Sequence, residues 1–232
     1  MNLYAAVIAA ALAAEYLLHL AADLLNLRAL GTGVPPEFAG VYDPATYRRS
    51  QEYTRAGTYF GILLSTAMLA LTYIFWFAGG FNAVDLTVRG WGLTGVQAGL
   101  AFIGILALLR SLVSLPFSVY STFVIEEKFG FNKTTPKTFI SDLLKGMLLS
   151  VTLGGLLVAG ILLLFEWAGP GAWTWCWGLG AAVVLLLQFV APVWLMPLFN
   201  KFTPLGEGEL KERILKYASD IGFPLRGIYV MD

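Results

Sequence analysis

Three ionisable residues recur at every fourth position early in the sequence. Glu15, His19 and Asp23 lie at i, i+4 and i+8, so a helix would place them in one polar stripe. About 12 Å of helix rise separates the two carboxylates, which is too far for them to share one metal ion comfortably. His19 could therefore chelate a metal with only one of them. We favour an internal polar network over a catalytic role for this stripe.

A single arginine interrupts the otherwise uncharged stretch 90–125. In a membrane-spanning helix, Arg110 needs a carboxylate or water, because an isolated charge is costly in lipid. We predict that Arg110 is a buried counter-ion for Glu15 or Asp23. Together with His19, these residues are our candidates for the polar lining of an interior chamber.

The sequence lacks the local motifs of several large enzyme classes. It contains no HExxH zinc motif, no GxxxxGK[ST] phosphate loop and no GxSxG nucleophile motif. One histidine and one cysteine, Cys176, cannot supply the three protein ligands of a typical catalytic zinc site. We therefore expect this chain alone to bind no metal and to be catalytically inert. Its net charge of zero argues against a nucleic-acid partner.

The elements that must position these residues are membrane-spanning helices. Of the 232 residues, 58% are hydrophobic and only 13% are charged, so the solvent of most of the chain is lipid. A span needs about 20 predominantly apolar residues. Dividing the apolar stretches at glycine, proline and charge clusters predicts five spans, at 3–27, 57–79, 96–123, 143–166 and 173–196. The predicted fold class is an all-α polytopic membrane bundle, with membrane lipids as partners.

The basic residues predict the orientation of this bundle. If the N-terminus lies outside, the inside segments are 28–56, 124–142 and the chain after 196. These segments hold twelve Lys and Arg residues, Arg226 included, whereas the outside loops hold only Arg89. We therefore expect the N-terminus outside and the C-terminal tail in the cytoplasm.

The composition changes after the last predicted span, so we divide the chain into a transmembrane domain, 1–196, and a cytoplasmic segment, 197–232. Apolar residues recur at helical spacing within 206–219, which predicts an ordinary soluble helix. Residues 228–231 favour a β-strand, and an isolated strand has no partner for its backbone groups. We expect segment 197–232 to be the beginning of a soluble α/β domain and the chain to be a fragment of a longer protein.

Four segments together resemble the type I CAAX prenyl proteases, which are integral-membrane zinc metalloproteases. They are 35–53, with PPEF and YRRSQEY; 126–136, EEKFGFNKTTP; 197–205, PLFNKFTPL; and 221–224, IGFP, leading to Tyr229 and Val230. Each segment is weak alone, but their order and spacing relative to the five spans is specific.

This resemblance implies seven long helices around a water-filled chamber, closed by a soluble metalloprotease domain. Zinc bound by a downstream HExxH motif and a later glutamate would activate water in the full-length protein. None of those ligands exists in this sequence, so only the loop motifs transfer. Their implied role is to brace the catalytic domain against the chamber, and the candidate residues are Glu37, Arg48, Glu126, Asn132, Lys133, Asn200 and Lys201.

The implied substrates are prenylated or membrane-associated proteins, and the implied partner is the missing C-terminal catalytic part. A bacterial inner membrane is favoured by composition, and the endoplasmic reticulum is the alternative for a eukaryote. Two other functions stay open. A proton- or ion-coupled transporter would use the same polar stripe, although no internal repeat supports it. A non-catalytic membrane scaffold is the third possibility.

Overall fold

The structure is a computed structural model that describes residues 2–31, 33–38, 40–225 and 227–231, with the side chain of Glu37 outside the described part. Arg226 also lies outside it. In chain order the elements are α1 (Leu3–Ala29), η1 (Pro36–Phe38), α2 (Pro44–Phe77), α3 (Gly80–Gly90), α4 (Gly95–Tyr120), η2 (Ser121–Glu126), α5 (Glu127–Phe129), α6 (Pro136–Leu149), η3 (Ser150–Gly154), α7 (Gly155–Ala168), η4 (Gly169–Gly171), α8 (Ala172–Val190), η5 (Ala191–Leu195), α9 (Met196–Phe199), β1 (Phe202–Pro204), α10 (Glu209–Asp220) and β2 (Tyr229–Met231).

Side-chain caps start three of the long helices. The Asn2 side chain accepts a hydrogen bond from the Ala5 amide at 2.8 Å, which caps α1. Asp43 caps α2 and Thr135 caps α6, and a proline follows each cap at the first helical position. These residues satisfy amides that have no partner within the helix, and proline has no amide to lose there.

Four helical segments of the described chain are long and apolar enough to cross a membrane. Three of them begin at Leu3, Pro44 and Gly95 and contain most of the first three predicted spans. The fourth, Pro136–Phe199, has 64 residues, whereas about 20 residues suffice for one crossing.

This fourth segment doubles back on itself and supplies two crossings. At η4 the chain turns through Gly169-Pro170-Gly171, and α7 then packs against α8. The Cys176 thiol lies 3.7 Å from the Ile161 carbonyl, and a Cβ on Gly160 would lie 3.2 Å from the Leu179 side chain. The prediction of an all-α polytopic bundle is confirmed.

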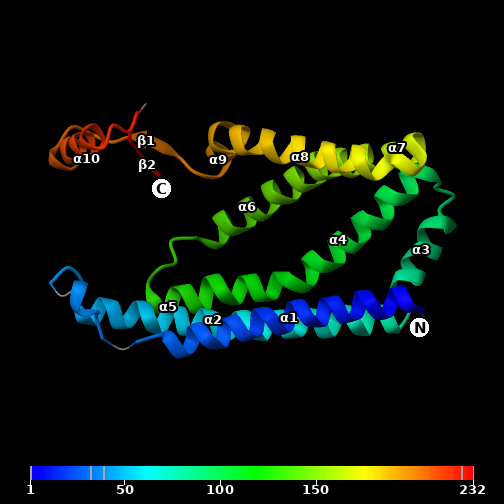
Figure 1. Cartoon of the computed structure of the whole chain (residues 1–232), viewed down its shortest axis with the longest axis horizontal. Helices are drawn as coiled ribbons and strands as arrows, with labels where there is room; N and C mark the ends of the chain where they lie inside the picture. The colour runs from blue at the N-terminus through cyan, green and yellow to red at the C-terminus, as the bar shows by residue number, and fades with distance from the viewer. Residues whose placement is uncertain (1, 32, 39, 226, 232) are drawn as a thin grey trace.

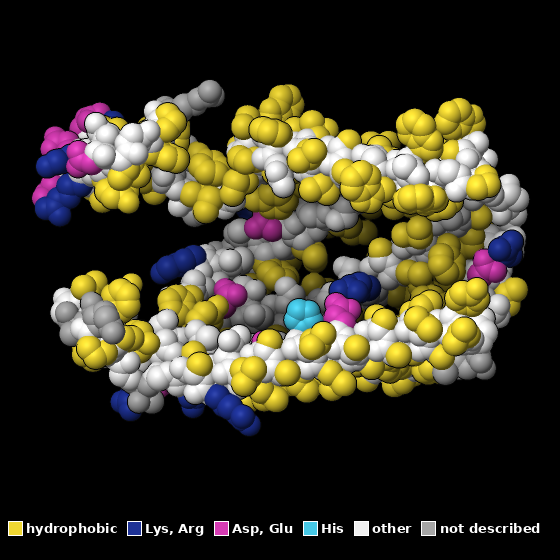
Figure 2. Space-filling model, in the orientation of Figure 1, with side chains coloured by type: hydrophobic (Ala, Val, Ile, Leu, Met, Phe, Trp, Pro, Cys, Tyr) yellow, Lys and Arg dark blue, Asp and Glu magenta, His cyan; other side chains and the backbone are white. Residues whose placement is uncertain are grey.

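The bundle has two arms with a hollow between them (Figures 1 and 2). One arm is the pair α1 and α2, and the other is the hairpin of α7 and α8; α4 runs between them. Two tyrosines join the first pair: the Tyr73 hydroxyl donates to the Ala9 carbonyl at 2.7 Å, and the Tyr16 hydroxyl bonds the Thr66 hydroxyl at 2.7 Å.

The loops segregate to the two ends of this bundle. The start of α2, the loop between α5 and α6, and α10 lie at one end, which we call the loop end (Figure 1). The N-terminus, α3 and the turn between α7 and α8 lie at the opposite end. The three segments predicted to share one side of the membrane therefore share one end of the molecule.

Very little of the described chain is buried. Buried hydrophobic residues are limited to Val84, Val88, Ile125, Phe129, Ala172 and Ala218. No residue in the most apolar stretch of any membrane-spanning segment is buried. The apolar surface of the spans therefore needs a cover other than the chain itself, and lipid is the natural one.

Two parts of the fold differ from the sequence prediction. Helix α3 was not predicted, because its apolar residues form only a narrow stripe with Val84 and Val88 at its buried positions. Strand β2 is not isolated: it pairs antiparallel with β1, with Thr203 opposite Val230. The expectation that residues 228–231 lack a strand partner is therefore wrong. The helix predicted within 206–219 is present as α10.

Candidate functional site

The polar stripe of α1 lies beside the contact between α1 and α2. Tyr16 faces α2, and helical geometry places Asp23 on nearly the same side as Tyr16, Glu15 about a quarter turn away from it, and His19 between the two. Accordingly Glu15 and His19 are exposed and Asp23 is half-buried. Figure 2 shows acidic, basic and histidine side chains gathered on the wall of the hollow. A polar surface on this wall can hold water at a depth where lipid could not.

Arg110 does not form the predicted ion pair. Among the described residues no carboxylate lies within 4.0 Å of its guanidinium, and the side chain is exposed. The prediction that Arg110 is a buried counter-ion for Glu15 or Asp23 is therefore wrong. The exposed guanidinium of Arg110 must therefore be hydrated or bind another anion.

The described residues offer no metal centre: no three His, Cys, Asp or Glu side chains among them are close enough to hold one ion. The residues present therefore do not fit the zinc that the resemblance implies. No chemical step at a metal can be assigned to this part of the chain.

A polar turn with several side-chain hydrogen bonds lies at the loop end, where α5 terminates. Gly130 adopts a left-handed conformation with φ of 72°, which ends the helix as glycine commonly does. The Glu126 carbonyl accepts the Phe131 amide at 2.9 Å, and the Asn132 side chain donates to the Glu127 carboxylate at 3.0 Å. The Asn132 side chain also accepts the Thr134 amide at 2.7 Å.

An aromatic cluster of Tyr53, Phe129 and Phe131 fixes this turn to α2. The ring of Tyr53 lies 5.5 Å from that of Phe129 and 4.7 Å from that of Phe131. Phe129 is buried, although most apolar side chains of the molecule are exposed. The first and second loops of the sequence are thereby held together by side chains from two of the motifs that carry the family resemblance.

A pocket of about 800 Å³ lies beside this cluster, lined by Pro44, Ala45, Arg48, Arg49, Glu52, Lys128 and Phe129. We call it the loop-end pocket. Arg48 and Glu52 are 3.9 Å apart, a loose and exposed ion pair. The ammonium of Lys128 lies 5.5 Å from the centre of the Phe129 ring. The pocket thus contains three cationic groups and one carboxylate.

A second connection at the loop end joins α6 to the beginning of the tail. The Lys145 ammonium donates to the Leu198 carbonyl at 2.9 Å and lies 3.4 Å from the Asp142 carboxylate. It also lies 5.6 Å from the centre of the Phe199 ring. Lys145 therefore fixes the segment that leads from the last span into β1.

The predicted bracing residues are divided between these structures. Arg48 lines the loop-end pocket, and Glu126 and Asn132 build the turn after α5. Lys133 is exposed beside Asn132, while Asn200 and Lys201 link α9 to β1. Glu37 has no described side chain. The bracing role itself stays a prediction.

Sequence reasoning missed Arg49, Tyr53 and Lys145 as contact residues. Arg49 and Tyr53 lie within the YRRSQEY motif, but the motif alone does not indicate which side chains reach the second loop. For Lys145 a sequence signal existed: it is the last charge before the uncharged stretch 146–165, where a partner is needed.

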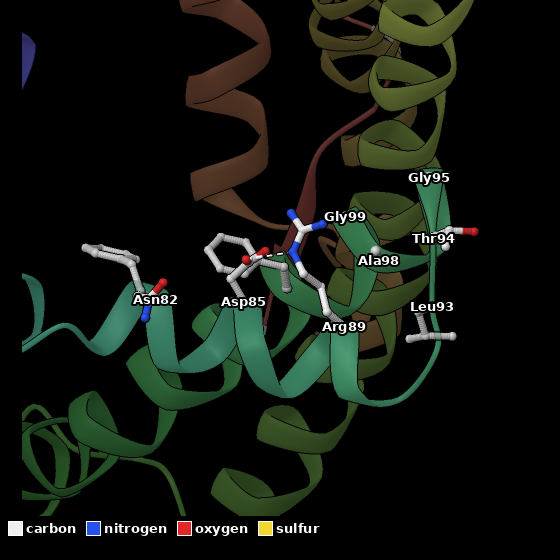
Figure 3. A pocket seen from close by; sticks show the side chains of 10 residues that line it. Asn82, Asp85, Arg89, Leu93, Thr94, Gly95, Ala98 and Gly99 are labelled. Carbon is white, nitrogen blue, oxygen red and sulfur yellow. Dashed lines mark hydrogen bonds and ion pairs between the residues drawn. The ribbon is translucent and has the colours of Figure 1, made fainter.

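A second pocket, of about 600 Å³, lies at the opposite end between α3 and α4 (Figure 3). Asp85 and Arg89 point toward each other across one turn of α3, 2.7 Å apart, and this hydrogen bond raises the pKa of Arg89. Small residues, Gly95, Ala98 and Gly99, form the facing wall on α4. Because its two charges neutralise each other, this pocket indicates no charged ligand.

Comparisons with known proteins agree with the architecture. The family model described as CAAX prenyl protease N-terminal, five membrane helices, matches residues 23–201. The chain is 38% identical over 213 residues to CAAX prenyl protease 1 of Saccharomyces cerevisiae, covering 87% of the chain and 47% of that protein. It is 34% identical over 213 residues to the CAAX prenyl protease 1 homolog of Homo sapiens, covering 87% of the chain and 44% of that protein.

A solved structure is similar over the whole chain. The crystal structure of S. mikatae Ste24p superposes with a TM-score of 0.83 at 33% sequence identity, covering 100% of this chain and 56% of that one. The chain spans about half the length of the curated relatives that it matches.

Proposed function

Because this chain belongs to the family of CAAX prenyl protease N-terminal domains with five membrane helices, we propose that it forms the membrane chamber wall of a zinc metalloendopeptidase. The observation that carries the proposal is the match of the family model to residues 23–201. The substrates would be prenylated or membrane-associated proteins, and the first of these classes agrees with the relatives' name, CAAX prenyl protease 1.

In this proposal the chain positions a reaction that other residues perform. The zinc ligands and the general base would belong to a C-terminal catalytic part that follows segment 197–232. The residues of this chain would supply two functions: a polar, hydrated wall at Glu15, His19, Asp23 and Arg110, and a braced loop end against which the catalytic part docks. Zinc, when bound, supplies an activated water for attack on a peptide carbonyl.

In this reaction the polar wall would keep the substrate peptide hydrated. A lipid-tailed peptide carries polar amides that must stay hydrated beside the membrane, because unsatisfied amides are costly in hydrocarbon. The exposed carboxylate, imidazole and guanidinium groups of the hollow can keep water there. The two arms would admit the substrate while the lipid-facing surface stays apolar.

We also propose the orientation that the basic residues predict. The loop end carries the two basic loops and the tail, so it would face the cytoplasm, with the N-terminus on the other side of a bacterial inner membrane or the endoplasmic reticulum. A cysteine-accessibility experiment at residues 31 and 92 would test this orientation, because labelling from opposite sides is expected.

The activity is tested with the full-length protein that contains this chain. We expect stoichiometric zinc and cleavage of a prenylated C-terminal peptide that stops with a chelator and returns with zinc. The isolated chain, 1–232, is the matched control and is expected to cleave nothing. A full-length protein without zinc and without peptidase activity would overturn the proposal and would make proton flux in liposomes the next measurement.

A further inference from the structure

We propose that the loop-end pocket binds the phosphate headgroup of an anionic phospholipid, with Arg49 and Lys128 as the principal ligands. The proposal concerns a site separate from the chamber wall and does not depend on proteolytic activity.

Two cations of the pocket have no carboxylate partner among the described residues. Arg49 comes from α2 and Lys128 from α5, and both line the same pocket. Within the described residues, no carboxylate lies within 4.0 Å of either charged group. The nearby carboxylates are otherwise engaged: Glu52 faces Arg48, and Glu127 accepts the Asn132 amide.

The fold holds these like charges together. The aromatic cluster of Tyr53, Phe129 and Phe131 fixes α5 against α2. Gly130 leaves room for Arg49, because a Cβ at that position would lie only 3.0 Å from the Arg49 Nη2 atom. The helix C-terminus at Gly130 offsets a fraction of the positive charge, and a bound anion would offset the remainder.

The pocket lies just beyond the apolar end of the third membrane-spanning segment. Ile125 is the last apolar residue before α5, and Lys128 and Gly130 follow it by about 4 to 8 Å of helix rise. Each headgroup layer extends about 5 to 8 Å beyond the hydrocarbon core. With the hydrocarbon core ending near Ile125, the Arg49 guanidinium, which reaches Gly130, would lie at the level of lipid phosphates.

The pocket between α3 and α4, at the opposite end of the bundle, differs from the loop-end pocket in its charges. Its single cation, Arg89, is paired with Asp85 at 2.7 Å, so it has no charge to offer an anion. The loop-end pocket keeps two unneutralised cations in about 800 Å³, which is large enough for a phosphate group with its glycerol substituents. Arginine forms two parallel hydrogen bonds to phosphate and lysine adds a mobile charge, so the pair suits this ligand.

The test measures binding of short-chain phosphatidylglycerol, phosphatidylcholine and inorganic phosphate to the full-length protein in neutral detergent. The Arg49→Gln/Lys128→Gln variant is expected to bind phosphatidylglycerol about 30-fold more weakly, since each basic group near a lipid contributes about a factor of five. The control variant Arg28→Gln/Arg55→Gln removes the same charge at the same end, outside the pocket, and is expected to change binding less than threefold, on the order of ordinary surface effects.

A charge-conserving variant, Arg49→Lys/Lys128→Arg, keeps the test decisive if the neutral variant unfolds, because it should retain most of the binding. Equal losses in the pocket and control variants would overturn the site. Binding of inorganic phosphate as strong as that of phosphatidylglycerol would overturn the lipid assignment. In a further outcome, chain 1–232 would bind phosphatidylglycerol through the pocket although the full-length protein does not. That result would overturn the lipid site, because Arg49 and Lys128 would then pair with a carboxylate of the catalytic part.

Discussion

The loop end and the wall of the hollow are built in opposite ways. At the loop end, Tyr53, Phe129 and Phe131 form an aromatic cluster, and Gly130 and Asn132 fix the turn beside it. Along the wall, the most apolar stretches of the spans contain no buried residue, and Arg110 has no carboxylate partner in the described chain. A cluster of side chains therefore holds the loop end, whereas only a few specific contacts, such as the Tyr16–Thr66 hydrogen bond, align the helices of the wall.

This difference indicates where the chain depends on what surrounds it. Between helices in lipid there is no hydrophobic driving force, so a few hydrogen bonds and close contacts must align the spans. The Tyr73–Ala9 and Tyr16–Thr66 bonds are of this kind. The loop end lies beyond the hydrocarbon core, among hydrated headgroups, where burial of aromatic surface still stabilises it. Mutations should consequently act on stability at the loop end and on function at the wall.

The largest effect on stability is expected for Tyr53→Ala, which removes both ring contacts of the aromatic cluster. We expect a loss of about 2 kcal/mol, the scale of a partly buried aromatic truncation with two ring partners. Thermal unfolding in detergent measures it. Tyr59→Ala on the same helix is the control, because Tyr59 is 58% exposed and should cost far less. Equal destabilisation by both variants would contradict the special status of the loop end.

A smaller loss is expected for Gly130→Ala. The φ of 72° costs a residue with a side chain about 1 to 2 kcal/mol, and the new Cβ would lie close to Arg49. Gly146→Ala in α6 is the matched control, since nothing lies within 4 Å of a Cβ there. In a helix interior the control change should be neutral or stabilising. If Gly130→Ala unfolds at the wild-type temperature, the left-handed turn does not hold the loop end.

Substitutions in the wall should lower the activity and leave the stability almost unchanged. Glu15→Ala and Asp23→Ala remove groups with no ion pair among the described residues, so the unfolding temperature of the chain should change little, within about 0.5 kcal/mol. In the full-length protein the same variants are expected to reduce peptide cleavage several-fold by drying the wall. Unchanged cleavage together with unchanged stability would exclude any role for the stripe.

The sequence predicts the helical part of this fold well, because runs of about 20 apolar residues have few alternatives in lipid. Helix α3 escaped prediction because its two buried valines lie among polar residues in a short segment between spans. The pairing of β1 with β2 depends on residues about 27 positions apart, and neither three-residue strand signals its partner.

The candidate site was predicted only in part. Asn132 and Arg48 were found through the loop motifs, and both lie in the loop-end structures. Arg110 was assigned to Glu15 or Asp23 because a charge within a span needs a partner, but which side chains meet across the bundle is a tertiary property that no local pattern encodes. For the same reason, the convergence of Arg49 and Lys128 on one pocket could be seen only in the structure.

The smallest predicted effect concerns pH at the start of α2. The Thr46 amide and hydroxyl donate to the Asp43 carboxylate and hold its pKa below the ordinary value of 3.8. Because the folded-state pKa is lowered, the cap is fully effective above about pH 4 and is lost as the pH falls through the folded-state value. Hydrogen exchange at the Thr46 amide should accelerate over that range relative to Asp43→Asn, which keeps a capping oxygen but cannot titrate. An identical pH dependence in the two proteins would show that the Asp43 carboxylate does not control the cap of α2.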